Sequence, residues 1–234
     1  MTQAVSLSFF RFGGIASRLW AFTQMGFARL AMPKTPDLAF WKLCGSGTGE
    51  GFTPLPNTAV YAILATWPDP DTARARVATA PVWQRYRAHA SESWTVFLTP
   101  TSARGHWSGT TPFTPGPASG RPALAALTRA TIKPAVAARF WRRVPDISAR
   151  IGADTNVVFK IGIGEVPLLH QVTFSIWPSE SAMAAFARTG PHAAAIRAVR
   201  DEGWFREELY ARFAIHSDMG SWNGTSPLTR LDPA

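Results

Sequence analysis

Few residues of this chain have types and spacings that could perform chemistry. Cys44 is the only cysteine, which excludes an internal disulfide and a cysteine-rich metal site and fits a reducing compartment. Glycine fills every second position from Gly45 to Gly51, but Glu50 stands where a dinucleotide fingerprint needs its third glycine, and no Gly-Lys-Ser/Thr follows. No serine, histidine and aspartate are spaced as a supportable triad, and no carboxylate pair stands out. The glycine run therefore predicts a flexible hairpin loop.

The elements that must position any functional residue occur twice in the sequence. Two stretches ending in Trp-Pro lie 110 positions apart, YAILATWP at 61–68 and VTFSIWP at 172–178. At the same offset Trp94 matches Trp204, and upstream, at an offset of 118, FWKL at 40–43 matches VFKI at 158–161. This period is too long for a solenoid repeat and predicts two copies of one small α+β unit.

Each copy predicts the order strand, helix, strand, strand, helix, strand, which is the split βαβ unit of ferredoxin-like folds. In the first copy we expect strands at 4–12, 39–43, 57–66 and 94–99, and helices at 15–30 and 67–89. Apolar residues at helical spacing indicate the first helix, and Asp69 or Asp71 is the expected N-cap of the second. In the second copy the same elements are expected at 124–132, 134–143, 156–163, 170–176, 179–200 and 207–215.

These units predict an α+β fold in which two fused ferredoxin-like repeats form a pseudo-dimeric α+β barrel. The expected organisation is a first repeat over 1–100, a Pro/Gly-rich linker over 101–122, a second repeat over 123–216 and a flexible tail over 217–234. The loop between the two middle strands is longer in the first copy, and such an insertion can become an asymmetric lid or pocket wall.

Bulk composition limits the partners. The formal charge is +9 and the sequence pI is about 10.8, yet no Lys/Arg tract suggests nucleic-acid binding. An evenly spread basic excess favours an anionic membrane surface or an acidic partner protein. No apolar run is long enough to span a membrane, and the first 30 residues lack a signal-peptide pattern, so we expect a cytoplasmic location. The ten Trp residues form either core or aromatic walls around a flat apolar ligand.

Five long stretches follow the sequence pattern of one enzyme family. They are FWKLCGSGTGEGFTPLPNTAVYAILATWP at 40–68, NVVFKIGIGEVP at 156–167, HQVTFSIWP at 170–178, RTGPHAAAIRAVR at 188–200 and GWFREELYARF at 203–213. In these stretches the chain resembles the spheroidene monooxygenases, carotenoid C-2 ketolases of purple phototrophic bacteria. The resemblance implies a haem protein that oxidises the C-2 methylene of an acyclic carotenoid such as spheroidene to a ketone. It also implies O2, a reduced ferredoxin-type electron donor and a location peripheral to the photosynthetic membrane.

Haem iron needs an axial side chain. His192 is the first choice, because related dimeric α+β barrel haem proteins commonly take their proximal histidine from the helix after the middle strands, and the first copy has Val82 at this position. His170, which opens a middle strand, is the second choice. His216 and Cys44 stay open; a buried lone cysteine is more often a small core residue.

Other roles implied by the resemblance are less specific. Arg129, Arg188 and Arg197 could meet haem propionates through charge-assisted contacts, although an exposed helix face is the more common explanation for each. Glu50 and Glu165 follow equivalent strands, and either could relay protons to bound oxygen. The absence of a hydrolytic triad fits an enzyme whose cofactor performs the difficult step.

Two other functions stay open at this point. The same fold could serve a cofactor-free or flavin-fed monooxygenase, or a carrier of haem or carotenoid without catalysis. A Soret absorption band separates the first alternative from a haem enzyme, and carotenoid conversion separates the second.

Overall fold

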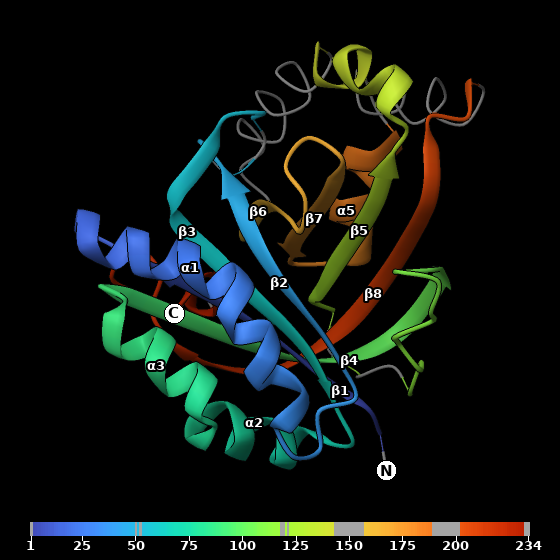
Figure 1. Ribbon diagram of the computed structural model, residues 1–234. Helices are drawn as coiled ribbons and strands as arrows, with labels where there is room; N and C mark the ends of the chain where they lie inside the picture. The colour runs from blue at the N-terminus through green and yellow to red at the C-terminus, as the bar shows by residue number, and fades with distance from the viewer. Residues whose placement is uncertain are drawn as a thin grey trace.

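Eight antiparallel strands close into a barrel in the computed structural model of the chain, which describes residues 2–49, 51, 53–117, 120, 122–142, 157–188 and 202–231 (Figure 1). Around the barrel the order is β1-β3-β2-β6-β7-β5-β8-β4. The first half contains β1 (Ala4–Arg11), α1 (Ile15–Ala31), η1 (Met32–Lys34), β2 (Phe40–Gly47), β3 (Pro56–Trp67), α2 (Pro70–Thr79), α3 (Pro81–His89) and β4 (Glu92–Gly105).

The second half contains β5 (Leu124–Ile132), η2 (Pro134–Val136) followed by helical residues 137–142, β6 (Phe159–Gly164), β7 (His170–Trp177), α5 (Glu180–Arg188) and β8 (Phe205–Gly220); η3 (Pro227–Arg230) follows. Within each half the strand order is the one that a split βαβ unit produces, β4-β1-β3-β2 and β8-β5-β7-β6. The halves join where β4 pairs with β8 and where β2 pairs with β6. The predicted α+β barrel of two ferredoxin-like repeats is therefore confirmed.

A capping aspartate and a proline set where the two helices between β3 and β4 begin. Asp69, one of the two expected N-caps, accepts a hydrogen bond from the Thr72 N–H at 2.8 Å. The single helix expected over 67–89 is instead two helices, because Pro81 has no N–H to donate and Ala80 before it is extended (φ −64°, ψ 134°).

Strands β2, β4 and β8 run further than the sequence suggests. β2 extends through Gly47 into the glycine run, and β4 continues to Gly105, inside the segment expected to be a linker. β8 continues to Gly220, so the chain after residue 216 is not a loose tail over the described residues. Asp218 accepts a hydrogen bond from Trp94 Nε1 at 2.7 Å, and Arg230 donates to the Val158 carbonyl at 2.9 Å. These contacts hold 217–231 against the barrel.

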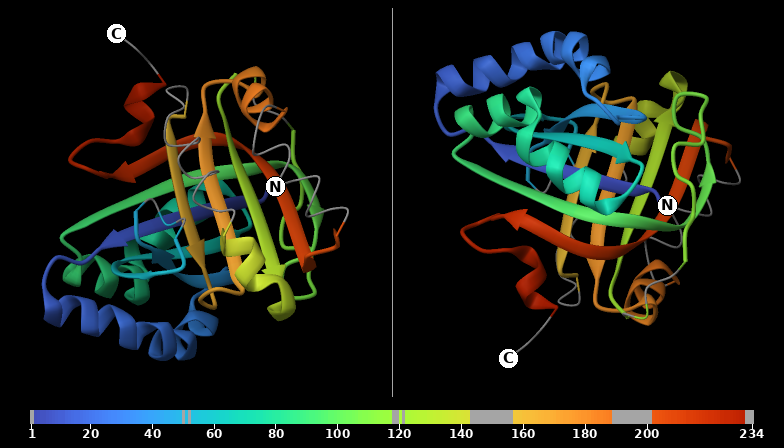
Figure 2. Two further views of the ribbon diagram at one scale, coloured as in Figure 1. Left: turned by 90° about the horizontal axis from the view of Figure 1, so that it is seen from above. Right: turned by 90° about the horizontal axis from the view of Figure 1, so that it is seen from below.

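The barrel interior is a packed core of inward-pointing side chains. Strand alternation turns Val5, Leu7 and Phe9 of β1 inward, and it does the same for Ala125, Leu127 and Arg129 of β5. On the outer face of the first half, α1, α2 and α3 bury a second apolar layer that includes Phe10, Tyr61 and Ile63 (Figure 2). The third cluster, on the second half, is small: Val157, Trp177 and Phe186 with two partly buried neighbours.

The same tight turn follows β4 and β8, a repeat that the sequence analysis did not identify. After β4 comes Trp-Ser-Gly-Thr at 107–110, and after β8 comes Trp-Asn-Gly-Thr at 222–225; both Trp–Thr pairs form β-bridges. The central residues of both turns have positive φ, which is the geometry of a type I′ turn: 54° and 72° in the first, 59° and 85° in the second. The turns fold Trp107 and Trp222 back over the barrel, one for each half.

We expect Gly220→Ala to destabilise the fold strongly. Gly220 has φ +87°, and an added Cβ would overlap the Ser93 carbonyl oxygen on the paired strand. Overpacking against backbone should cost about 3 kcal/mol or more of unfolding free energy. Gly224 is the matched control, with φ +85° but no atom within 4 Å of a new Cβ, and Gly224→Ala should cost only about 1 kcal/mol. Chemical denaturation measures both; equal losses would contradict the overlap argument.

Candidate functional site

A buried arginine in the barrel core marks one mouth of the barrel. The strand register matches Phe9 of β1 with Arg129 of β5, since Ala4 pairs with Trp67 and Leu124 pairs with Trp177. Phe9 packs among aromatic rings, whereas Arg129 is 1 % exposed and needs anionic partners at the same inward position. The duplication has therefore placed an aromatic side chain at one end of the barrel and a charge at the other.

Two carboxylates neutralise this buried charge. Arg129 contacts Glu207 through Nη1, and its Nη2 lies 3.7 Å from Glu165 Oε2. Lys42 Nζ lies 3.1 Å from Glu165 Oε1, and Trp107 Nε1 donates to Glu165 Oε2 at 2.8 Å. Two cations thus face two anions in what we call the Arg129 cluster: Lys42, Trp107, Arg129, Glu165 and Glu207.

The cluster also fixes the first tryptophan turn. The N–H groups of Ser108 and Gly109 donate to Glu207 at 3.0 and 2.7 Å, and Lys42 Nζ donates to Ser108 Oγ at 2.6 Å. Burial raises the pKa of Glu207, but these N–H donors and Arg129 outweigh it and hold that pKa below its usual range. Glu207 therefore stays ionised and keeps Trp107 over the mouth.

The opposite mouth has a milder version of the same arrangement. Arg11 pairs with Glu92 at 2.8 Å, Glu92 accepts from the Gly224 N–H at 2.7 Å, and the Arg11 guanidinium lies 4.3 Å from the centre of the Trp222 ring. The Arg11 side chain is 34 % exposed. Solvent screens this ion pair, whereas the Arg129 cluster is a buried charge network.

His170 borders the Arg129 cluster. Its Nδ1 is buried 3.5 Å from Glu165 Oε2 and has no hydrogen-bond partner among the described residues. Burial lowers the pKa of His170, and although Glu165 opposes that effect, Arg129 adds to it. A neutral imidazole beside a carboxylate can accept or pass on a proton, so this pair could serve acid–base steps at the rim.

The outer face of the second half presents small and polar side chains where the first half has a covered apolar layer. Gly162, Thr173 and Thr128 form one row across β6, β7 and β5, and Ser175 and Ala126 belong to the next outward row, whose β6 member is Lys160. We call the five positions other than Lys160 the small-residue face. In the first half, Leu43, Ile63 and Ser8 form the row equivalent to Gly162, Thr173 and Thr128. Ser8 is fully buried and hydrogen-bonded by Trp83 of α3, whereas Thr128 is exposed.

The long hairpin of the first copy borders this face. Ser46 Oγ donates to the Gly162 carbonyl at 3.0 Å, and Gly51 approaches the same carbonyl so closely that a Cβ there would overlap it. The predicted insertion thus contacts the edge of the small-residue face at β6.

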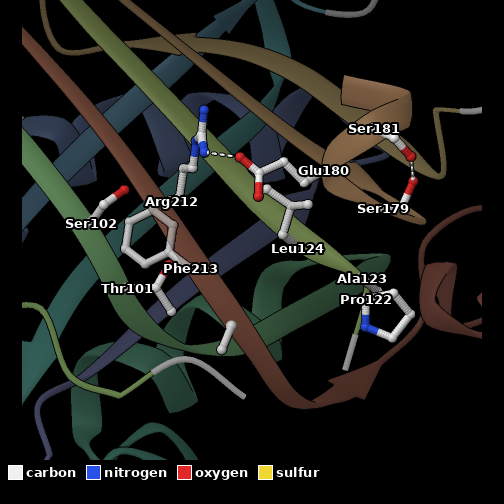
Figure 3. A pocket seen from close by; sticks show the side chains of 11 residues that line it. Thr101, Ser102, Pro122, Ala123, Leu124, Ser179, Glu180, Ser181, Arg212 and Phe213 are labelled. Carbon is white, nitrogen blue, oxygen red and sulfur yellow. Dashed lines mark hydrogen bonds and ion pairs between the residues drawn. The ribbon is translucent and has the colours of Figure 1, made fainter. Parts of the chain in front are cut away.

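A surface depression of about 530 Å³ lies between the later part of β4, the start of β5, the middle of β8 and the start of α5 (Figure 3). Arg212 and Glu180 pair across it, as Figure 3 shows, and hydroxyl side chains such as Ser102 and Ser179 line its sides. Among the described residues that line it, there is no His, Cys, Tyr or Met of the kind that binds haem iron axially.

Comparison with known proteins assigns the family. The chain is 55% identical to the spheroidene monooxygenase of Cereibacter sphaeroides over 97% of this chain and 71% of that protein. It is 54% identical to that of Rhodobacter capsulatus, over 95% of this chain and 94% of that protein. The chain belongs to the spheroidene monooxygenase family.

More distant relatives agree with this family and with the fold. The Rubrivivax gelatinosus spheroidene monooxygenase is 36% identical over 89% of this chain and 81% of that protein. Among solved structures, aldoxime dehydratase OxdRE in complex with butyraldoxime has a TM-score of 0.61 at 12% identity, covering 97% of this chain and 86% of that one. Another aldoxime dehydratase has a TM-score of 0.59 at 11% identity, over 92% and 82%. These two show the fold alone, and no protein-family model matches the chain.

The structure brings together some of the residues that the sequence singled out. Arg129, Glu165, His170 and Cys44 gather at one barrel mouth, but Arg129 has carboxylate partners inside the barrel where we expected a haem propionate. His216 lies apart and hydrogen-bonds with Thr99. His192, Arg197 and Glu50 lie outside the described residues; Arg188 is the last residue of α5, and its side chain is not among those described.

The described residues test the fit of a haem ligand. Cys44 is fully buried, and burial together with Glu165 raises its pKa, so it is a protonated thiol within the core and does not fit a thiolate ligand. No cluster of three or more His, Cys, Asp or Glu residues that could hold a metal ion occurs in the described part of the chain. The small-residue face does fit one side of a flat ligand, because its side chains are short.

Sequence reasoning missed Lys42, Trp107 and Glu207. The repeat alignment in the sequence matched Lys42 with Lys160. The strand register instead makes Lys42 equivalent to Ile161, so Lys42 points inward and Lys160 points outward. Arg129 itself was the available signal, since a charge at an inward position of an apolar strand requires buried carboxylate partners.

We expect Arg129→Met to destabilise the fold by about 3–5 kcal/mol, because it leaves two carboxylates facing one buried lysine. Arg11→Met at the opposite mouth is the control and should cost about 1 kcal/mol or less, since that pair is solvent-screened. Guanidinium unfolding curves measure both. Similar losses for the two variants would show that burial of the Arg129 cluster is not what matters.

We also expect His170 to make stability depend on pH. Its folded-state pKa lies below the ordinary histidine pKa of about 6.5, so below about pH 6.5 the unfolded chain binds the extra proton and stability falls with acidification. His170→Gln should therefore lose less unfolding free energy than the parent chain between about pH 7.5 and 5.5. Parallel stability curves for the two proteins over that interval would refute this assignment.

Proposed function

We propose that this chain is a haem monooxygenase that oxidises the C-2 methylene of an acyclic carotenoid, converting spheroidene to spheroidenone. Identity of 54–55% to two spheroidene monooxygenases over nearly the whole chain is the observation that carries the activity. Two successive hydroxylations at C-2 give a gem-diol, which loses water to form the ketone. Each round consumes one O2, two electrons and two protons and releases one water.

We place the reaction on the outer face of the second half. Among the described residues, packed apolar side chains occupy the barrel interior, so we look for a hydrocarbon site outside it. Outside, α1, α2 and α3 cover the first half, and on the second half the small-residue face has short side chains, with Lys160 at its β6 edge. This asymmetry supports the location, because a planar cofactor packs against a flat surface of short side chains.

His192 is the proposed axial ligand, and it follows α5 by four positions in the sequence. Haem held there would supply the iron that activates dioxygen. Among the chain's own residues, Arg188 and Arg197 are the proposed propionate partners, and Thr128 and Thr173 offer hydroxyl groups on the small-residue face. The His170–Glu165 pair, at the rim of the mouth, is a proposed source of protons.

A reduced ferredoxin-type protein is the proposed electron donor. Such proteins are generally acidic, and the chain carries a formal charge of +9. The proposed docking residues are Arg139, Arg142, Arg143 and Arg150; the first two are exposed helical side chains, and the last two lie outside the described residues. Within the described residues, no helix is both long and apolar enough to cross a bilayer. We propose a cytoplasmic protein that binds the photosynthetic membrane peripherally.

The haem assignment predicts the spectrum of a single variant. His192→Ala, expressed with a haem supply, should lose the Soret band or shift it, while its far-ultraviolet circular dichroism stays unchanged. His89→Ala is the control and should keep the band, since His89 stacks on Trp20 at 3.8 Å on the outside of the first half. A full Soret band in His192→Ala together with its loss in His170→Ala would move the ligand to His170.

The same spectrum distinguishes the alternatives. A chain purified with a haem supply and lacking any Soret band would favour a cofactor-free monooxygenase of this fold. A Soret band without carotenoid conversion in the presence of reductant and O2 would favour a haem or carotenoid carrier.

A further inference from the structure

The outward face of α1 is apolar. Ile15, Leu19, Phe22, Phe27 and Leu30 are 62–79% exposed, and they recur at the spacing of one helical stripe. Their spacing in the sequence led us to predict the helix. In the structure the opposite stripe of this helix, Ala21, Gln24 and Ala28, packs against the barrel. We call the five exposed side chains the α1 stripe. These side chains are grouped on one face of the helix, whereas exposed apolar residues on ordinary protein surfaces are scattered singly.

The position of α1 leaves this stripe accessible. α1 contacts β2, β3 and α3 on its inner side, and both views of Figure 2 show it along one border of the molecule, with no described element beyond it. The stripe therefore faces away from the rest of the fold.

The charges around the stripe indicate what covers it. No Asp or Glu occurs between residues 12 and 36, whereas Arg18, Arg29 and Lys34 are all cationic. Arg29 and Lys34 are exposed and have no ion pair among the described residues, while nearby Asp37 already pairs with Arg76. An apolar stripe bordered by cations is the pattern of a helix that lies in the interface of an anionic bilayer.

A second copy of the chain fits this surface less well. Two α1 stripes packed together would bring two uncompensated sets of cations side by side, and like charges repel. An anionic lipid surface supplies both the apolar layer and the negative charge.

We propose that α1 is the membrane-docking element, lying in the surface of an anionic bilayer with the α1 stripe inserted and Arg29 and Lys34 on the headgroups. This deepens the peripheral membrane contact included in the proposed function, but it rests on α1 alone and requires neither haem nor carotenoid. Since the substrate class proposed above dissolves in bilayers, docking by α1 would hold the enzyme where that substrate is concentrated.

Co-sedimentation with vesicles tests the apolar contribution. The full-length chain should bind vesicles of phosphatidylcholine plus phosphatidylglycerol, and Phe22→Gln/Phe27→Gln should weaken the partition coefficient by roughly tenfold or more. Both side chains are exposed, so the fold should be unaffected. Val166→Gln/Leu168→Gln removes two exposed apolar side chains from the β6–β7 loop and should leave binding unchanged.

The charge contribution has its own variants. Arg29→Glu/Lys34→Glu should abolish the preference for phosphatidylglycerol. The control Arg142→Glu/Arg206→Glu makes the same change in net charge at exposed sites of the second half, and it should keep most of that preference. Equal losses in both pairs would show that only net charge matters and would overturn docking by α1.

Two further outcomes would overturn the proposal. Vesicle binding that is indifferent to the Phe22/Phe27 variant would exclude the α1 stripe. A chain that fails to bind vesicles but changes from dimer to monomer on the same substitutions would show that the stripe covers a second copy. His192→Ala should bind vesicles like the parent chain, so failure of the haem assignment and failure of α1 docking are separate results.

Discussion

The buried charge of Arg129 constrains both halves of the barrel. A guanidinium inside a core is tolerated only when carboxylates and hydrogen bonds replace the water it has lost. Glu207 comes from β8, Glu165 follows β6, and Lys42 on β2 neutralises the remaining negative charge. One ion network therefore ties together strands from both halves. Trp107 joins the network through Glu165, so the cover of that mouth has the same cause.

The two halves share one backbone plan but use their surfaces differently. In the first half the outer face buries large apolar side chains under three helices, and this half supplies most of the second hydrophobic layer. In the second half the equivalent row is Gly162, Thr173 and Thr128, which gives little apolar surface for a helix to bury. A duplicated unit that no longer needs both faces for stability can give one of them to a ligand, and the second half has the surface suited to that.

The sequence predicted the architecture because the architecture depends on periodicity. Repeated Trp-Pro pairs, alternating strands and the Asp69 cap are local signals, and all of them agree with one fold. The site is harder to predict because it depends on register. The alignment of FWKL with VFKI differs by one residue from the strand register, in which Lys42 is equivalent to the inward-pointing Ile161 and not to Lys160. Glu207 and Trp107 were missed because their partners are far away in the sequence. Glu207 meets Arg129 only when β5 and β8 pair, and it meets the Trp107 turn only when β4 and β8 pair.

The direction of the α1 stripe shows another limit of sequence reasoning. Helical spacing of apolar residues predicts a helix but does not say which side meets the core, and here the small residues Ala21 and Ala28 allow close packing while the large ones face outward. Around the barrel, β2 lies under α1 and is also the neighbour of β6, where the small-residue face begins. The stripe and that face are therefore adjacent around the barrel wall, with the glycine-rich hairpin at the boundary between them, where Gly51 meets Gly162. The glycine-rich hairpin of the first copy therefore separates the outward helix of one half from the small-residue face of the other, and a change in its length or sequence would alter the border between these two surfaces without changing the strand order.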